Sequence, residues 1–207
     1  MPTDLTYYTH PQSRGRIAHW MLEEVGQPYA TVWVGFGPEM KGADYRAVNP
    51  MGKVPALRDG DVVVTEAAAI CAYLADRFPD AGLAPEPSSR GRAAYLRWLF
   101  FAAGPLEQAT TAQALGWQVP EGRSGMVGFG SLASTLDALE GAVSGGPFLC
   151  GDLFTAADVY VASSLGWGLM FGTVEKRPAF EAYVARCQSR PAAQRMQRIN
   201  QARIDAT

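Results

Sequence analysis

The spacing of apolar residues changes once along this chain of 207 residues, and that change limits its fold more than any other feature. Up to residue 78, short β-prone runs alternate with segments of helical period, and Asp59-Gly60-Asp61 supplies a strong hairpin signal between two of the runs. From residue 90 the apolar residues recur at helical spacing only. Prolines and a serine pair mark the stretch between the two regions. The pattern predicts an α/β domain over 1–78, a linker over 79–89 and an all-α domain over 90–207.

The individual elements follow from the same signals. In the first domain the order β-α-β-(α)-β-β-α is expected, with strands at 5–8, 29–34, 56–58 and 62–64 and helices at 14–25 and 66–78. In the second domain the expected helices cover about 90–115, 126–143, 156–169 and 179–202, the last broken by Pro191. Thr155 and Asp158 have the spacing of an N-terminal capping box for the third of these helices.

Composition and charge exclude several classes of protein. Hydrophobic residues make up 48% of the chain, which is enough for a sizeable core. The net charge of −2 gives no reason to expect nucleic acid or an anionic membrane as partner. The N-terminus carries no signal-like apolar stretch, and no apolar run reaches the length of about 20 residues that spans a membrane. Three cysteines, odd in number, far apart and without nearby histidines, argue against disulfides and a metal site. We therefore expect a cytoplasmic protein.

Four segments carry the strongest local signals: 7–16 (YYTHPQSRGR), 49–57 (NPMGKVPAL), 65–74 (TEAAAICAYL) and 154–160 (FTAADVY). In residue type, order and spacing they resemble the cytosolic glutathione S-transferase family, and together they span most of the chain. The resemblance implies a thioredoxin-like N-terminal domain that binds glutathione, an α-helical C-terminal domain that shapes the pocket for a second substrate, and a homodimer. It implies no metal and no redox cofactor, with glutathione as the co-substrate.

Val54 and Pro55 stand directly before an expected strand. By residue type alone, this proline opens an edge strand, and cis X-Pro bonds are rare, at about 5–6%. The resemblance instead implies a cis Val54–Pro55 bond. In that arrangement the N–H and C=O of Val54 pair with the cysteinyl part of glutathione as an added strand would.

Glu66 and Ala67 begin an expected helix, whose free N–H groups suit a carboxylate. Glu66 either favours the helix N-terminus without a ligand or, as the resemblance implies, faces the ammonium of the γ-glutamyl end while the Ala67 N–H meets its carboxylate. The family usually has Ser or Thr in place of Ala67, so a hydrogen bond of about 0.5–1.5 kcal/mol is missing and affinity should fall without vanishing. Lys53 and Lys41 are candidates for the glycyl carboxylate, although most surface lysines are only solvated.

The group that activates the glutathione thiol is less closely defined. A free thiol has a pKa of about 8.5, so a hydroxyl that donates to the sulfur near a helix N-terminus favours the thiolate. The serine-type pattern of the family implies Ser13, which could equally cap the helix. The tyrosine-type pattern implies Tyr7 or Tyr8, of which strand alternation turns one inward. The length of the loop resembles the serine-type pattern, so Ser13 leads.

Cysteine chemistry is disfavoured in this loop. No cysteine occurs between Tyr7 and Arg16, where members of the family that form mixed disulfides with glutathione carry one. Cys71 shares an apolar helix face and is interpreted as a buried filler. His10 lies in the same loop and either assists the reaction or is solvated.

The predicted reaction is attack of the glutathione thiolate on a hydrophobic electrophile, as in detoxification. Family geometry suggests Phe101, Pro105 and Trp117 for the pocket of that second substrate. Two alternatives stay open because fold does not fix reaction. One is other glutathione-dependent chemistry, namely peroxidase, isomerase, ether-cleavage or dehalogenation activity. The other is a non-catalytic ligand-binding member, which Ala67 supports and the intact peptide-binding motifs oppose.

Overall fold

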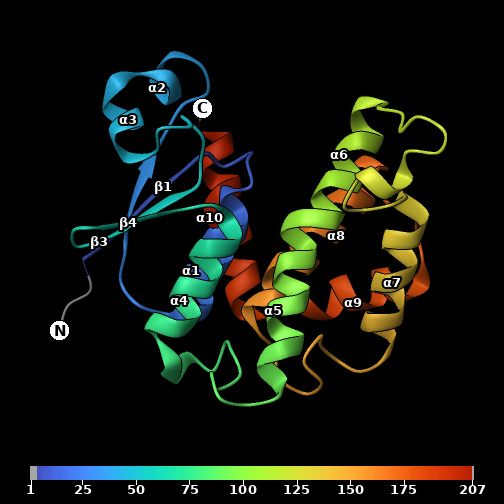
Figure 1. The fold of residues 1–207 in the computed structure, drawn as a ribbon. Coiled ribbons are helices and arrows are strands. Elements are labelled where there is room, and N and C mark those ends of the chain that lie inside the picture. The colour runs from blue at the N-terminus through green and yellow to red at the C-terminus, as the bar shows by residue number, and fades with distance from the viewer. Residues whose placement is uncertain (1–3, 207) are drawn as a thin grey trace. The chain divides into compact units, whose positions relative to one another are not determined.

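A four-stranded mixed sheet forms the first part of the computed structural model, which describes residues 4–206 (Figure 1). The strands stand in the order β2-β1-β3-β4, and β1 pairs in parallel with β2 but antiparallel with β3, which pairs antiparallel with β4. Their bounds are β1 (Leu5–Thr9), β2 (Ala30–Trp33), β3 (Ala56–Asp59) and β4 (Val62–Thr65). The tight turn between β3 and β4 uses Gly60 at φ 61°, as its hairpin signal predicted.

Alternate residues of β1 face two different layers. The buried Tyr7 ring lies 5.7 Å from the ring of His19 on α1, whereas the Tyr8 ring lies 6.0 Å from the ring of Tyr45 on α3. α4 packs beside α1. The helices around the sheet are α1 (Gly15–Val25), α2 (Pro38–Lys41), α3 (Ala43–Val48), α4 (Ala67–Arg77) and α10 (Pro191–Asp205). The predicted thioredoxin-like arrangement is confirmed.

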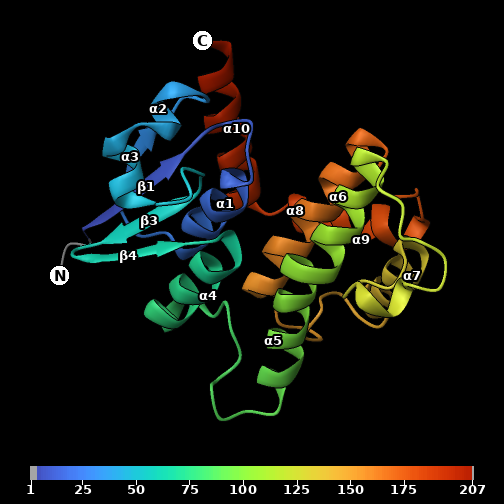
Figure 2. The same cartoon turned by 45° about the horizontal axis from the view of Figure 1, so that its top comes forward.

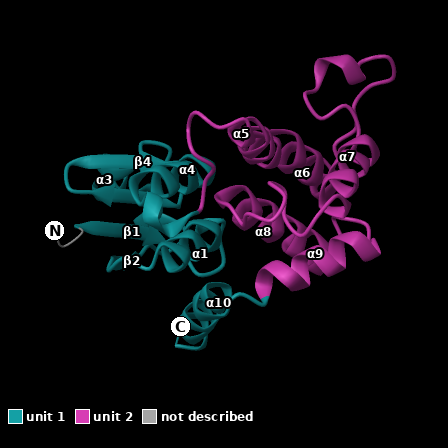
Figure 3. Cartoon of the chain, turned by 90° about the horizontal axis from the view of Figure 1, so that it is seen from below, with its two compact units in different colours: residues 1–82, 189–207 teal, residues 83–188 magenta. Residues whose placement is uncertain are grey.

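The contacts divide the chain into two units, Met1–Gly82 with Ser189–Thr207 and Leu83–Gln188 (Figure 3). The last helix therefore belongs to the first unit, whereas the sequence placed all of 90–207 in the helical domain. α10 packs along α1 (Figure 2), where Asn200 Nδ2 lies 2.8 Å from Nδ1 of the buried His19. Arg190, directly before α10, forms an ion pair with Glu24 on α1. Helical period alone does not reveal which layer a helix packs on, which is why the sequence missed this assignment.

The second unit is all-helical, as predicted. A π-helical turn, η2 (Ala102–Leu106), which contains Pro105, joins α5 to α6 and so interrupts the single long helix expected at 90–115. The helices of this unit are α5 (Gly91–Phe101), α6 (Glu107–Leu115), α7 (Leu132–Ser144), α8 (Ala156–Phe171) and α9 (Pro178–Gln188). Short 3₁₀ turns occupy η1 (Pro79–Ala81) and η3 (Ser124–Met126). No helix among residues 4–206 has both the length and the apolar character needed to cross a bilayer.

The predicted capping box opens α8 and is fully buried. The Asp158 carboxylate accepts hydrogen bonds from the Thr155 amide at 2.9 Å, the Leu149 amide at 2.9 Å and the Tyr183 hydroxyl at 2.8 Å. Burial raises the pKa of Asp158 while these donors oppose the rise. The motif thus ties the loop before α8 to α9, a role in folding with no chemistry attached.

Candidate functional site

Three chain segments meet at one edge of the sheet. β1 ends at Thr9, and the antiparallel β3 begins at that same edge, with Ala56 opposite Tyr8. β4 runs antiparallel to β3, so its last residue, Thr65, lies opposite Ala56. The loop after β1, the loop before β3 and the turn after β4 therefore surround one place on the sheet. We call this place the sheet-edge site, made of Ser13, Lys41, Lys53, Val54, Pro55, Glu66 and Ala67.

Ser13 stands where the loop after β1 enters α1. Its Oγ accepts a hydrogen bond from the Gly15 amide at 3.0 Å and donates one to the His10 carbonyl at 2.7 Å. The half-buried hydroxyl therefore lies at the positive end of the helix dipole and caps the first N–H of α1. A Cβ on Gly15 would come within 2.9 Å of Ser13 Oγ and 2.0 Å of Thr9 Oγ1, so this close approach of hydroxyl and helix needs glycine.

The two tyrosines of β1 occupy different environments. Tyr7 is fully buried, and its hydroxyl contacts the Gly15 carbonyl and lies 3.0 Å from Thr9 Oγ1. Desolvation by burial raises the pKa of Tyr7 well above its ordinary value. Tyr8 is half-buried on the opposite face, with the Arg58 guanidinium 5.9 Å from the centre of its ring. Strand alternation thus turns Tyr7 into the core, where its hydroxyl is occupied within the domain.

The loop before β3 carries a cis Val54–Pro55 peptide bond, as the family resemblance implied. The Lys53 carbonyl accepts hydrogen bonds from Asn49 Nδ2 at 2.7 Å and from the Tyr45 hydroxyl at 2.8 Å. Neither the N–H nor the C=O of Val54 has a hydrogen-bond partner among residues 4–206. Two donors therefore hold the backbone of Lys53, and Val54, which follows it, has an unpaired N–H and C=O. Such a backbone can pair with a further extended segment.

Asn49 is a functional residue that the sequence reading missed. It is 3% exposed, and its Oδ1 accepts a hydrogen bond from the Met51 amide at 3.0 Å while Nδ2 binds the Lys53 carbonyl. The signal was present, because Asn before Pro is typical of a turn in which the Asn side chain binds the backbone two residues on. Asn49 fixes the turn that presents Val54.

Lys41 contacts this loop and Lys53 is part of it. Lys41, at the end of α2, donates from Nζ to the Gly52 carbonyl at 2.5 Å and lies 3.3 Å from the Met51 carbonyl. Lys53 has an exposed side chain, and its ammonium forms no ion pair among the described residues. The Lys41 ammonium therefore lies at the Gly52 carbonyl, two residues before Val54, and Lys53 directly precedes Val54 in the chain.

Glu66 has the most unusual backbone of the site. At φ 68° and ψ 122° it is the single non-glycine residue with positive φ in the described part of the chain. Such a conformation costs on the order of 1–3 kcal/mol and is typical of functional sites. It places an exposed carboxylate directly before α4, whose first residue, Ala67, is buried. The first amides of α4 thus face the site with a carboxylate beside them.

Cysteine and metal chemistry find no support in this region. Cys71 is fully buried, and desolvation raises the pKa of its thiol to about 12, so it is a core residue and not a nucleophile. This confirms its interpretation as a buried filler. Within residues 4–206, no three His, Cys, Asp or Glu side chains gather as metal ligands would.

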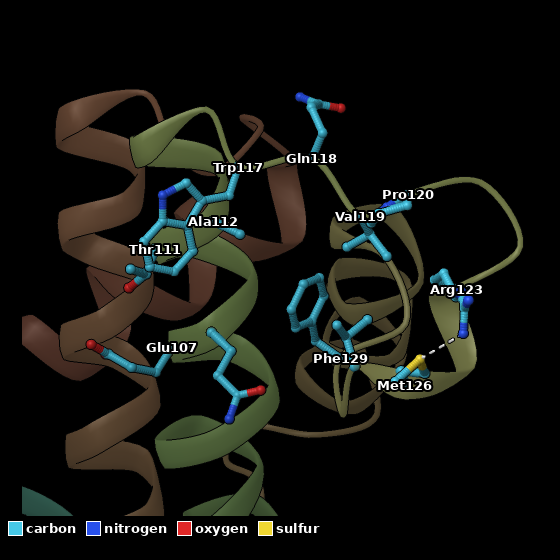
Figure 4. A pocket seen from close by; sticks show the side chains of 12 residues that line it. Glu107, Thr111, Ala112, Trp117, Gln118, Val119, Pro120, Arg123, Met126 and Phe129 are labelled. Atoms are coloured by element: carbon cyan, nitrogen blue, oxygen red, sulfur yellow. Dashed lines mark hydrogen bonds between the residues drawn. The ribbon is translucent and has the colours of Figure 1, made fainter.

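The side chains suggested for a second-substrate pocket lie in the helical unit. Phe101 ends α5, Pro105 lies within η2, and Trp117 follows α6. Trp117 lines a pocket between α6 and the loop that follows it, which we call the helical pocket (Figure 4). Phe101 and Pro105 do not line this pocket. The suggestion that these three residues shape the pocket of a second substrate stays a prediction.

Known proteins match this chain in both its N-terminal and its C-terminal part. The family model for the N-terminal domain of glutathione S-transferase matches residues 14–77, and the model for its C-terminal domain matches residues 126–191. Glutathione S-transferase GstA of Escherichia coli O157:H7 is 32% identical over 181 residues, which cover 86% of this chain and 89% of that protein.

Solved structures share the whole fold. A glutathione transferase from Methylococcus capsulatus str. Bath has a TM-score of 0.81 at 33% identity, covering 96% of this chain and 99% of its own. A sphingomonad glutathione S-transferase complexed with glutathione has a TM-score of 0.77 at 29% identity, covering 94% and 98%. Family models, relatives and fold therefore lead to one conclusion: the chain belongs to the glutathione S-transferase family.

Proposed function

We propose that this protein binds glutathione at the sheet-edge site and conjugates its thiolate to a hydrophobic electrophile. The observation that carries the proposal is the meeting of three open groups at one edge of the sheet. These are the serine-capped start of α1, the unpaired backbone of Val54 and the free amides of α4 behind the strained Glu66. Each matches a different part of a thiol-containing tripeptide, and a homologous sphingomonad enzyme has been solved with glutathione.

The peptide is held mainly by backbone. In our proposal the N–H and C=O of Val54 pair with the cysteinyl residue of glutathione as an added strand. The γ-glutamyl carboxylate meets the Ala67 N–H at the positive end of α4, and the Glu66 carboxylate meets the ammonium. Lys41 and Lys53 attract the glycyl carboxylate.

Ser13 activates the thiol in this proposal. Its single hydrogen is donated to the His10 carbonyl, so it rotates toward the sulfur on binding while Oγ continues to accept from the Gly15 amide. The hydroxyl and the α1 dipole favour the thiolate, and the thiol proton passes to solvent. The sulfur electron pair then forms the bond to the electrophilic carbon, and a leaving group departs with its own pair. Tyr7 supports the loop from within the core.

A conjugation assay tests this function. Glutathione and chlorodinitrobenzene, with the purified protein, are expected to yield the thioether and chloride at a rate proportional to enzyme concentration. Product mass identifies the bond formed. Binding of glutathione without turnover against a panel of aryl halides, epoxides and enones would contradict the transferase assignment.

A non-catalytic glutathione-binding role is the second candidate. Ala67 lacks the side-chain hydroxyl usual at this place, and the Ser13 hydrogen already has an acceptor in the His10 carbonyl. Binding without turnover would favour this candidate. Peroxide reduction, isomerisation, ether cleavage and dehalogenation would use the same thiolate, and separate substrate screens distinguish them.

Assembly and location complete the proposal. We propose a homodimer in the cytoplasm, where its three cysteines, none of which forms a disulfide within residues 4–206, stay reduced. Light scattering after gel filtration measures the oligomeric state, and fractionation of the source cells measures the location.

A further inference from the structure

Three hydroxyl groups lie together where β1 meets α1, those of Tyr7, Thr9 and Ser13. Ser13 belongs to the sheet-edge site, whereas Tyr7 and Thr9 are fully buried. The sheet fixes the main chain of Thr9, because its carbonyl accepts a hydrogen bond from the Val34 amide at 2.8 Å. Its side chain reaches the first turn of α1, where a Cβ on Gly15 would lie 2.0 Å from Oγ1. Thr9 is therefore a buried hydroxyl held firmly beside the start of α1.

The number of available hydrogens decides which way these hydroxyls point. A hydroxyl has one hydrogen to donate, whereas a carbonyl can only accept. The Tyr7 hydroxyl contacts the Gly15 carbonyl, so the tyrosine hydrogen lies in that bond. Burial raises the pKa of Tyr7 well above its ordinary value, which keeps this hydrogen in place. The Tyr7 and Thr9 hydroxyl oxygens lie 3.0 Å apart. The hydrogen between them therefore comes from Thr9.

The His10 carbonyl has two hydroxyls beside it. Ser13 Oγ donates to it at 2.7 Å. Thr9 Oγ1 lies 3.4 Å from the same oxygen, beyond the range of about 2.5–3.0 Å of an ordinary hydrogen bond between oxygens. No backbone amide within residues 4–206 donates to this carbonyl. When Ser13 turns toward the glutathione sulfur, Thr9 is thus the hydroxyl placed to become the donor to His10.

We propose that Thr9 is a positioning residue, which frees Ser13 to donate to the glutathione sulfur by replacing it at the His10 carbonyl. The inference rests on the proposed function. The change is a rotation of two hydroxyls, and no covalent bond forms or breaks. The Ser13 O–H turns from the His10 carbonyl to the sulfur, and the Thr9 O–H turns from Tyr7 to the His10 carbonyl. The Gly15 carbonyl keeps the Tyr7 hydroxyl as its donor throughout.

The exchange affects the thiol because a carbonyl that is left without a donor away from water is unfavourable. Without the Thr9 hydroxyl, Ser13 reaches the sulfur only by leaving the His10 carbonyl unpaired. Ser13 would then stay on the carbonyl in a larger fraction of molecules. The thiolate would lose part of the hydrogen bond that stabilises it, so the pKa of the bound thiol would rise.

Thr9→Val tests the proposal, because valine has nearly the shape of threonine but no hydroxyl. We expect the pKa of the bound thiol, read from thiolate absorbance against pH, to rise by about 0.5 to 1, and kcat/KM to fall about three- to tenfold. Glutathione affinity, measured by calorimetry, should stay within about twofold, since the backbone contacts of the peptide remain. Thr9→Ala removes the same hydroxyl without a new methyl group beside Gly15 and should raise the thiol pKa equally. Thr9→Ser keeps the hydroxyl and should have the parental thiol pKa.

Tyr7→Phe is the matched control. It removes a buried hydroxyl of the same cluster but leaves the Thr9 hydrogen available to His10. Its free energy of unfolding in urea should fall, while the thiol pKa stays parental. Equal rises of the thiol pKa in Tyr7→Phe and Thr9→Val would overturn the proposal, because loosening of the core would then be the cause.

Two further results separate this proposal from the proposed function. If Ser13→Ala raises the thiol pKa and Thr9→Val leaves it unchanged, the role of Thr9 is overturned and the proposed function stands. If the thiol bound to the parent protein has the pKa of about 8.5 of a free thiol, the activation by Ser13 is overturned, and the role of Thr9 with it.

Discussion

The sheet-edge site and the helical pocket present different parts of the polypeptide to a ligand. At the sheet edge the outward groups are mostly backbone: the Val54 amide and carbonyl, the first amides of α4 and the capped start of α1. In the helical pocket they are side chains, chiefly Trp117 and the apolar residues of the loop. A backbone site depends on residues that hold an unusual chain path, whereas a side-chain site depends on the residues that line it.

This difference explains where substitutions should act. The sheet edge should be sensitive to residues that never touch a ligand, such as Asn49, whose two hydrogen bonds hold the turn before Val54. Substitutions in the lining of the helical pocket should leave the sheet-edge site unchanged, because no residue is shared between the two. Substitutions at the two places should therefore have separable effects.

The largest expected effect is that of Ser13→Ala on turnover. Removing a hydroxyl that donates to the developing charge should lower kcat/KM about a hundredfold or more. Glutathione affinity should stay within about threefold, because the backbone contacts remain. The pKa of the bound thiol, read from thiolate absorbance against pH, should rise in the variant toward about 8.5.

Tyr8→Phe is the control for this comparison and should keep most activity. A Ser13→Ala protein with unchanged rate and thiol pKa would remove Ser13 from the mechanism.

Acidification should loosen the first unit through His19. Burial lowers its pKa to about 4, against about 6.5 in an unfolded chain. Between these values the unfolded chain binds more protons, so stability falls as pH drops through this window. From about pH 7 to about pH 5 the free energy of unfolding should fall by about 2 kcal/mol through this group. Urea unfolding against pH measures it.

His19→Gln is the matched variant for the pH series. It removes the titrating group, so its stability should change less steeply than that of the parent protein between about pH 7 and about pH 5. If the free energy of unfolding changed equally steeply with pH in the two proteins, groups other than His19 would be responsible for the pH dependence.

Asn49→Ala should weaken glutathione binding about tenfold. The substitution leaves the Lys53 carbonyl with one donor instead of two and releases the Met51 amide, a loss of about 1–1.5 kcal/mol in holding the turn. Tyr45→Phe removes only the other donor to the Lys53 carbonyl and should have a smaller effect. Calorimetry with glutathione compares the two variants, and an Asn49→Ala protein of parental affinity would contradict the positioning role.

The smallest expected effect is an increase in glutathione affinity. Ala67→Ser restores a hydroxyl at the start of α4 and should tighten glutathione binding about two- to tenfold, equivalent to about 0.5–1.5 kcal/mol. Ala69→Ser, on the exposed side of the same turn, is the control and should change nothing. Identical affinities in the two variants would mean that the γ-glutamyl carboxylate does not bind at this place.

More of the sheet-edge site than of the helical pocket could be predicted from the sequence. The cis Val54–Pro55 bond was expected only from the resemblance to the family, whereas strand alternation predicted that Tyr7 and Tyr8 would face different layers. The positive φ of Glu66 could not be predicted from the sequence, since a glutamate before a helix usually has a negative φ. The helical pocket was not predicted, because the sequence suggested Trp117 for a second-substrate pocket together with Phe101 and Pro105, which do not line the helical pocket.

The central claim is that the sheet edge binds glutathione, and titration calorimetry tests it most directly. Glutathione added to the purified protein should give saturable heat with one site per chain. The dipeptide Cys-Gly, which lacks the γ-glutamyl group that we assign to Glu66 and Ala67, should bind at least about tenfold more weakly. No heat at millimolar glutathione, or equal affinity for the two peptides, would contradict the account.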